Sequence, residues 1–364
     1  MNDTIKVVCE NDSRTHDVAM GTTLHDIALE CRRGGAHPFL AAYVNNRIKE
    51  LSYKVYTPVT VRLIDITEAE GHRVYQRTAI FMLQKAVGDL FPGRTLYVRH
   101  SLGSGLYCEI EGMPELSSAD TEAIALRLHE IAAADYPIAR TRRPTGEVRE
   151  IYRAHGFDDK IALLDSRPRL YSDLYTMDDA VGYFYGALTP STGYVDRVDV
   201  RPYYNGLYLM LPDRQNPSSL KDDIHADKML DVFRGYKSWV DIMGVPTVGR
   251  LNGKVLSGDG SELIKIAEAF HEKQLATIAD TIADANSARG TRLVLISGPS
   301  SSGKTTFAKR LGIQLRILGM NPVLISLDDY FVDRDKTPLD ENGDYDYEAL
   351  EAIDLELFND HLRR

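Results

Sequence analysis

The sequence has few of the features that mark secreted, disulfide-rich or membrane-spanning proteins. It contains only three cysteines, Cys9, Cys31 and Cys108, which lie far apart and form no C-x-x-C pair. A disulfide framework or a thiolate zinc site is therefore not expected, and so few cysteines are typical of a reducing cytoplasm. No apolar run approaches the ~18 residues that a membrane span needs, and the first residues show no secretion-signal pattern. We therefore expect a cytoplasmic protein without a membrane partner.

Positive charge is also scarce. The 364 residues include 43 Lys and Arg against 53 Asp and Glu, which gives a formal net charge of −10. This balance argues against a protein that mainly coats nucleic acid, although a local basic patch can still exist. The composition is that of a globular protein, 43% hydrophobic and 26% charged, and the length predicts two or three domains.

The first part of the chain has the element order of a small mixed sheet. Strands, with alternating or short buried apolar runs, are expected at residues 4–10, 14–18, 40–44 and 60–64. Asn11-Asp12-Ser13 has turn chemistry, and a short helix is expected from Leu24, with an N-cap in the preceding Gly21–Thr23. Strand, strand, helix and further strands make a β-grasp-like order.

Three stretches of this region resemble the TGS domain that opens threonyl-tRNA synthetases: Gly21–Asp26, Ala42–Arg47 and Val61–Ile64. The likeness extends into the second additional domain of those synthetases, through residues 76–93, Tyr152–Leu164 and the strand-rich stretch to Pro212. The resemblance implies a TGS-like β-grasp domain at 1–66 and an α+β additional-domain-like domain at 67–215.

The chain departs from this family at its reactive side chains. The family has an H-x-x-x-H pair on the helix that opens the additional domain, whereas this chain has Arg77 and Phe81 at the matching positions. The family's later Cys/His pair also has no counterpart, because no cysteine follows Cys108. Arginine and phenylalanine cannot replace two imidazoles as metal ligands or proton carriers. We therefore expect a retained scaffold here, not a deacylase or metal site.

A connecting segment is expected at residues 216–290, after the Pro-, Asn- and Ser-rich stretch 212–220. Apolar residues at helical spacing from Leu263 to Ile282 predict one long amphipathic helix within it. A P-loop domain is expected at 291–364.

The strongest chemical signal is a complete G-x-x-x-x-G-K-[ST] motif. With the threonine that follows it, the motif supplies the candidate ATP-binding residues Gly298, Pro299, Ser300, Ser301, Ser302, Gly303, Lys304, Thr305 and Thr306. A β-rich apolar run, 292–297, precedes the motif, a helix-like run follows it, and a second β-rich run lies at 323–327. This order predicts the parallel βαβ unit that begins a P-loop NTPase sheet. The alternative is a glycine-rich turn with a solvated lysine.

These residue types follow from phosphate chemistry. Glycines let backbone amides approach a phosphate at the start of a helix. Lys304 is expected to reach the β/γ-phosphates of ATP, and Thr305 to place its hydroxyl on Mg²⁺. Asp328, after the second strand, is expected to bind Mg²⁺ or to accept a proton from an attacking hydroxyl. The alternative for Asp328 is a role in capping a helix or forming a turn. For Asp329 this structural role is the favoured interpretation.

The P-loop, Leu327–Phe331 and Asp344–Asp346 together resemble uridine kinase and its phosphoribulokinase-related relatives. The resemblance implies that Asp328 is the base on the nucleoside 5′-hydroxyl and that Tyr330 and Phe331 line the nucleoside pocket. It also implies that Asp346 hydrogen-bonds the ribose hydroxyls, although Tyr347-Glu348 stands where the family has His-Pro.

We therefore expect an ATP- and Mg²⁺-dependent nucleoside kinase, with Lys304 and Asp328 as catalytic residues and uridine or a close relative as substrate. One rival is a nucleotide-gated regulator that binds RNA through its synthetase-like domains, with Arg140–Arg143 as the basic patch. Another is a kinase of a phosphorylated sugar. The nucleobase preference, the purpose of the N-terminal domains and any homo-oligomer stay open.

The stretch from Gly298 to Arg364 is shorter than a P-loop kinase domain and contains no arginine-bearing lid. We therefore expect the kinase domain to be C-terminally incomplete. The phosphate loop should be formed, the nucleoside pocket incomplete, and the 364-residue chain inactive alone.

Overall fold

The computed structural model describes residues 4–31, 37–220 and 227–363. It divides into two compact units, Met1–Ser257 and Gly258–Arg364. The division falls inside the segment that the sequence marks as connecting. The protein is a mixed α+β multidomain chain with several sheets. Across the described residues, no helix is both long and apolar enough to cross a membrane.

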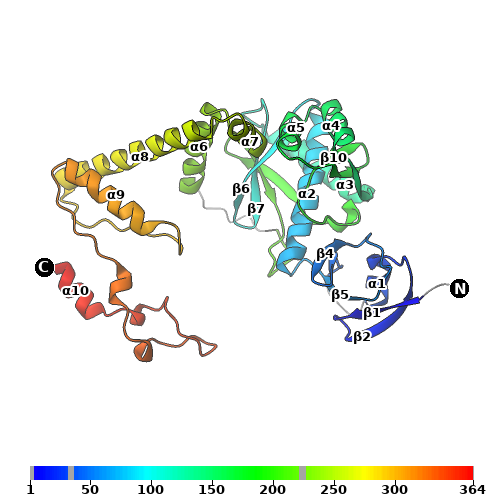
Figure 1. Ribbon diagram of the computed structural model, residues 1–364, viewed down its shortest axis with the longest axis horizontal. Helices are drawn as coiled ribbons and strands as arrows, with labels where there is room; N and C mark the ends of the chain where they lie inside the picture. Colours follow the sequence, from blue (N-terminus) through cyan, green and yellow to red (C-terminus); the bar gives the residue numbers. More distant parts are fainter. Residues whose placement is uncertain (1–3, 32–36, 221–226, 364) are drawn as a thin grey trace. The chain divides into compact units, whose positions relative to one another are not determined.

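The first sheet has five strands in the order β2-β1-β5-β3-β4 (Figure 1). Its strands are β1 (Thr4–Cys9), β2 (Arg14–Ala19), β3 (Ala41–Val44), β4 (Arg47–Glu50) and β5 (Val59–Ile64). β1 and β5 are parallel and the other neighbours are antiparallel, which confirms the small mixed sheet predicted from the sequence.

Helix α1 (Leu24–Glu30) covers this sheet. A capping box fixes its start: the Thr23 hydroxyl accepts from the Asp26 amide (3.1 Å), and the Asp26 carboxylate accepts from the Thr23 amide (3.4 Å). Leu24 and Ile27 are fully buried in one apolar cluster with side chains of β1 and β5. The helix therefore forms where a capping residue directly precedes apolar residues that the sheet can bury.

Two antiparallel sheets and a central helix, α2 (Ala69–Leu90), follow. The four-stranded sheet, in the order β11-β12-β7-β6, consists of β6 (Leu96–Leu102), β7 (Gly105–Ile110), β11 (Asp199–Tyr203) and β12 (Gly206–Met210). The three-stranded sheet, in the order β10-β9-β8, consists of β8 (Ile138–Pro144), β9 (Tyr171–Met177) and β10 (Ala180–Gly182). One buried apolar cluster joins α2 to both sheets.

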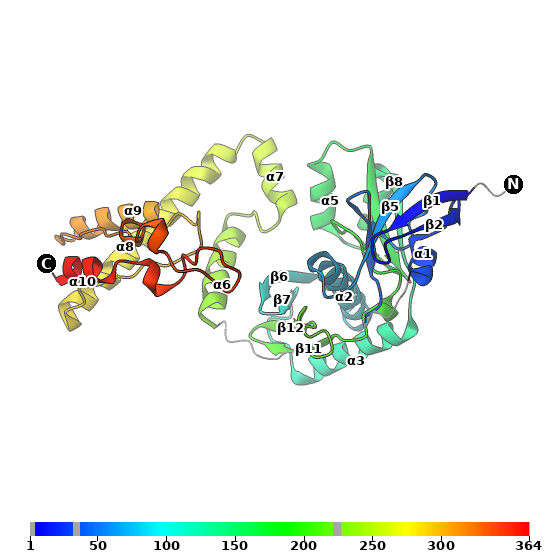
Figure 2. The same cartoon turned by 90° about the horizontal axis from the view of Figure 1, so that it is seen from below.

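The first unit contains further helices. They are α3 (Ser118–Ala134), α4 (Thr145–Ala154), α5 (Asp158–Asp165), the 3₁₀ turn η1 (Thr192–Tyr194), α6 (Asp227–Ile242) and α7 (Val248–Leu256). Helix α7 packs on α5. Helix α3 lies beside β11 (Figure 2). From α6, Phe233 stacks on the ring of His100 at 3.8 Å between centroids.

The second unit contains the helices α8 (Gly260–Arg289), α9 (Lys304–Ile317) and α10 (Leu355–Arg363) and the 3₁₀ turns η2 (Leu327–Tyr330), η3 (Arg334–Lys336) and η4 (Leu350–Ala352). The long helix predicted within the connecting segment is confirmed as α8. The described residues 258–363 form no strand, so the predicted parallel βαβ unit is wrong for this part of the chain. Leu295 and Val323, from the two expected strands, are 81% and 83% exposed. A strand forms only with a hydrogen-bonded neighbour, and neither run pairs with one.

Gly71 gives a direct test of the packing at the start of α2. A Cβ atom at Gly71 would lie 1.7 Å from the Asp65 carbonyl oxygen, whereas a Cβ at Gly88 on the same helix would have no neighbour within 4 Å. We expect Gly71→Ala to destabilise the protein by about 1–3 kcal/mol, because the backbone must move. Gly88→Ala, the control, should stabilise it by up to about 1 kcal/mol through helix propensity. Urea unfolding followed by far-ultraviolet circular dichroism measures both, and equal effects would contradict the close approach.

Candidate phosphate-binding loop and arginine pocket

The glycine-rich loop leads directly into helix α9. Gly303 is the N-cap of α9 and has φ = 87°, a left-handed conformation that favours glycine, and Ser301 has φ = 60°. A Cβ atom at Gly298 would lie 2.9 Å from Ser302 Oγ, so a larger residue there would have to displace that hydroxyl. The result is a tight turn at a helix N-terminus, where free amides and the helix dipole favour an anion.

Lys304, the first residue of α9, folds back over this loop. Its Nζ donates to the carbonyl oxygens of Gly298 (2.8 Å) and Pro299 (3.1 Å). An ammonium group has three protons, so one donor remains for a further acceptor. Thr305 and Thr306 follow in the first turn of α9 and are exposed. The loop therefore brings a cation and hydroxyl groups to one helix end.

The loop is held in place by the packing of α9 on α8. Leu311 and Leu315 of α9 share an apolar cluster with Leu275 and Ala279 of α8. Beside the cluster, the Arg310 guanidinium donates to the Glu272 carboxylate and holds the pKa of that carboxyl below its usual value. The buried contacts give most of the attachment, because exposed ion pairs contribute little.

Asp328 lies on the 3₁₀ turn η2 and not at the end of a strand, and its side chain is exposed. Among the described residues, no hydrogen bond or ion pair joins Asp328 to Lys304 or Thr305. The structure thus leaves this expected base and metal ligand accessible to solvent, without a direct link to the glycine-rich loop.

The expected substrate residues lie together in the segment from η2 to α10. Tyr330 is buried: its ring contacts Phe358 edge-on at 5.1 Å, and its hydroxyl lies 2.8 Å from His361 Nδ1. Phe331 is 40% exposed and packs edge-on against Tyr347, the residue after Asp346. Tyr330 therefore forms part of the core of this segment, whereas Phe331 lies on its surface.

Asp346 already makes two hydrogen bonds within its own turn. Its Oδ1 accepts from the amides of Glu348 (3.0 Å) and Ala349 (3.2 Å). Within the described chain no partner is found for Oδ2, so one carboxylate oxygen can accept from a ligand.

The two positions that match the synthetase histidines are filled by structural contacts. Arg77 donates to the Glu70 carboxylate (2.7 Å) and to the Ala187 carbonyl oxygen (3.0 Å). Phe81 is fully buried and lies 5.2 Å from the ring of Phe184. These side chains tie α2 to the stretch after β10, a structural role.

A surface pocket of about 370 Å³ opens beside this stretch. Its lining is rich in arginine and tyrosine: Arg140, Arg142, Arg167, Arg169, Tyr171, Tyr183 and Tyr185. Arg140 and Arg142 alternate on β8 and so project to one face of the sheet.

Most of this positive charge is uncompensated. Arg140 pairs with Asp173 at 2.7 Å and lies 3.9 Å from Glu50, whereas Arg142, Arg167 and Arg169 have no carboxylate within 4.0 Å in the described parts of the chain. Arg167 instead donates to the hydroxyls of the pocket tyrosines.

Glu50 also links the wall of this pocket to the first sheet. It lies on β4, and the Tyr175 hydroxyl of β9 donates to it at 2.8 Å. Burial raises the pKa of Glu50, against the lowering effect of Tyr175 and Arg140.

Sequence reasoning found only part of this pocket. The run Arg140–Arg143 stood out as basic, and two of its members line the pocket, but Arg167 and Arg169 gave no signal because folding brings them there from the end of α5. The same holds for Cys9 and Cys31, which were judged too far apart for a thiolate site. Folding places both thiols beside the carboxylate of Asp12.

Comparison with known proteins found similarity over half of this chain. No protein-family model matches the chain. Threonine–tRNA ligases are similar to it: that of Symbiobacterium thermophilum is 28% identical over 185 residues, and that of Desulforamulus reducens 27% over 183. That of Francisella tularensis is 23% identical over 181 residues. The matches cover 50% of this chain and 28–29% of each ligase. The chain thus spans less than a third of the length of these relatives, and the similarity lies in their N-terminal region of TGS and editing domains.

Proposed function

We propose that the protein is a cytoplasmic, ATP-dependent nucleoside kinase that phosphorylates the 5′-hydroxyl of uridine or a close relative. The observation that carries the proposal is the loop Gly298–Gly303, closed by a left-handed glycine at the N-terminus of α9 with Lys304 folded across it. This arrangement suits the phosphates of a nucleoside triphosphate.

In this proposal each residue has a definite task. The Lys304 ammonium group breaks its hydrogen bonds to the carbonyl oxygens of Gly298 and Pro299 and binds the β/γ-phosphates instead. The Thr305 hydroxyl would bind Mg²⁺. Asp328 takes the proton of the 5′-hydroxyl as its oxygen attacks the γ-phosphorus, and ADP is the leaving group. The free Oδ2 of Asp346 accepts from the ribose, and the exposed ring of Phe331 contacts the base.

RNA binding by the first unit is a second candidate function, favoured by the arginine pocket. Three arginines without carboxylate partners face a concave surface in a protein of net charge −10. Exposed rings of Tyr171 and Tyr185 lie beside them, as in sites where bases stack and phosphates pair with arginine. The similar proteins are ligases named for tRNA, which supports an RNA as the ligand.

The role of Lys304 is tested by nucleotide binding to this chain. We expect Lys304→Ala to weaken binding of a fluorescent ATP analogue with Mg²⁺ by about 10–100-fold, because a hydrogen bond to a charged group is worth ~1.5–3 kcal/mol. Lys309→Ala is the matched control on the same helix, where the lysine is exposed, and should bind normally. If the two variants bound the ATP analogue with equal affinity, the motif would be a glycine-rich turn that does not bind nucleotide.

The role of Asp328 is tested by turnover of the full-length protein. Asp328→Asn should lower uridine-dependent ADP release by roughly 10²–10⁴-fold, the usual contribution of a general base, with little change in ATP affinity. Asp329→Asn should keep near-normal turnover. Normal turnover in Asp328→Asn would assign this residue to the turn alone.

The pocket is tested by the salt dependence of RNA binding, measured by fluorescence anisotropy of a labelled single strand. Combining Arg142→Ala and Arg167→Ala should weaken binding and reduce the slope of log K against log salt by about 0.7 per lost phosphate contact. Arg47→Ala, exposed on β4, is the control. An unchanged slope in the double variant would count against RNA at this pocket.

A further inference from the structure

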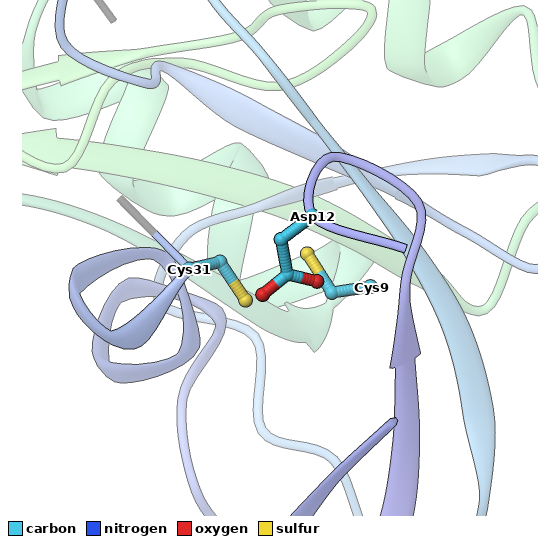
Figure 3. Close-up of side chains that lie close together, drawn as sticks. All are labelled: Cys9, Asp12 and Cys31. Atoms are coloured by element: carbon cyan, nitrogen blue, oxygen red, sulfur yellow. The ribbon is translucent and has the colours of Figure 1, made fainter. Parts of the chain in front are cut away.

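Three side chains from separate elements converge at one end of the first sheet (Figure 3). Cys9 is the last residue of β1, Asp12 lies in the turn to β2, and Cys31 is the C-cap of α1. Their two sulfur atoms and a carboxylate oxygen all lie within 4.8 Å of one another. Over the described residues, this is the one group of at least three such side chains close enough to hold a metal ion.

A fourth candidate ligand, His16 of β2, lies at the edge of this cluster, beside Asp12 and Cys31. Its Nε2 lies 2.8 Å from Asp12 Oδ2 and 3.6 Å from Cys31 Sγ. The set therefore consists of two thiols, one imidazole nitrogen and one carboxylate oxygen. These are the ligand types that Zn²⁺ prefers.

The geometry of the turn presents one oxygen of Asp12 to the cluster. Oδ1 accepts from the Arg14 amide at 3.0 Å and so fixes the turn. Asn11 locks the same turn to β5, because its side chain both accepts from and donates to the backbone of Leu63. The other oxygen, Oδ2, lies 2.8 Å from His16 Nε2.

One separation already suits a tetrahedral ion, and His16 has to move toward Cys9 to complete the set. Zinc bonds of ~2.0–2.3 Å place neighbouring ligand atoms about 3.3–3.8 Å apart. The 3.6 Å between Cys31 Sγ and His16 Nε2 falls in this range, and the Asp12–His16 hydrogen bond has to open by only a few tenths of an ångström.

The burial of the cluster favours a cation over a purely apolar packing role. Cys9 is fully buried, Cys31 is 2% exposed and the Asp12 side chain 5% exposed. A carboxylate withdrawn from water beside two thiols is costly unless it is fully paired. The Arg14 amide and His16 compensate this charge in part, since the His16 side chain is itself 19% exposed.

We propose that Cys9, Asp12, His16 and Cys31 form a structural Zn²⁺ site that ties the first hairpin to the end of α1. On binding, both S–H bonds break, the two protons go to solvent, and the thiolate electron pairs coordinate the ion. Four protein ligands leave no open position, so the site stabilises the fold and does no chemistry on a substrate.

The test uses the untagged, reduced 364-residue chain saturated with zinc and then desalted. Mass spectrometry of metal content should find about one zinc per chain, and cobalt substitution should give thiolate-to-metal charge-transfer bands. A chelator should lower the melting temperature. Cys108→Ala, which removes the buried third cysteine outside the cluster, should keep the zinc content and the chelator effect of the wild type.

Two variants make the result decisive. Cys31→Ser should lose the zinc and the chelator effect. Asp12→Asn keeps a side-chain oxygen for the turn but loses the charge. If Asp12 is a ligand, this variant should weaken zinc affinity by more than the ~10–100-fold lost when a residue that only hydrogen-bonds a ligand is removed. The proposal is overturned if the reduced wild type takes up no zinc, if both variants retain it, or if the chain contains a Cys9–Cys31 disulfide in place of metal.

Discussion

Burial of helix α2 is the constraint on which the first unit depends. Its buried residues Phe81, Met82 and Leu83 are consecutive, so apolar contacts surround the helix and both sheets must pack against it. Lys85 of this helix is a buried charge, and the carboxylates of Asp89, Asp178 and Asp179 neutralise it. Because β9 and β10 rest on this helix, α2 also sets the position of the arginine pocket.

The fold was predictable where short-range patterns decide it. The alternation in β1, the Thr23–Asp26 cap of α1 and the apolar spacing of α8 are properties of neighbouring residues, and the structure contains each of these elements. The β-rich runs 292–297 and 323–327 have the right residues for strands but no neighbour to pair with in the described structure. A strand is completed by distant residues, and local pattern carries no information about them.

The candidate sites also divide into one set by neighbouring residues and others built from distant residues. The phosphate loop is continuous in sequence, so its motif reports the glycines, the lysine and the helix start together. The pocket and the sulfur cluster are assembled from segments far apart: Arg140 meets Arg169, and Cys9 meets Cys31. Spacing rules for metal ligands describe compact loops, and they overlook a site built from the end of a strand and the end of a helix.

Glu50 connects the first sheet to the sheet that lines the pocket. The carboxylate lies on β4, yet its partners Arg140 and Tyr175 belong to the sheet that lines the pocket. An anion that draws the Arg140 guanidinium toward itself removes positive charge from Glu50, whose buried carboxylate then becomes more costly to keep ionised. We therefore expect anion binding in the pocket and protonation of Glu50 to be thermodynamically linked, so that by reciprocity the protonation state of Glu50 changes the affinity of the pocket for an anion.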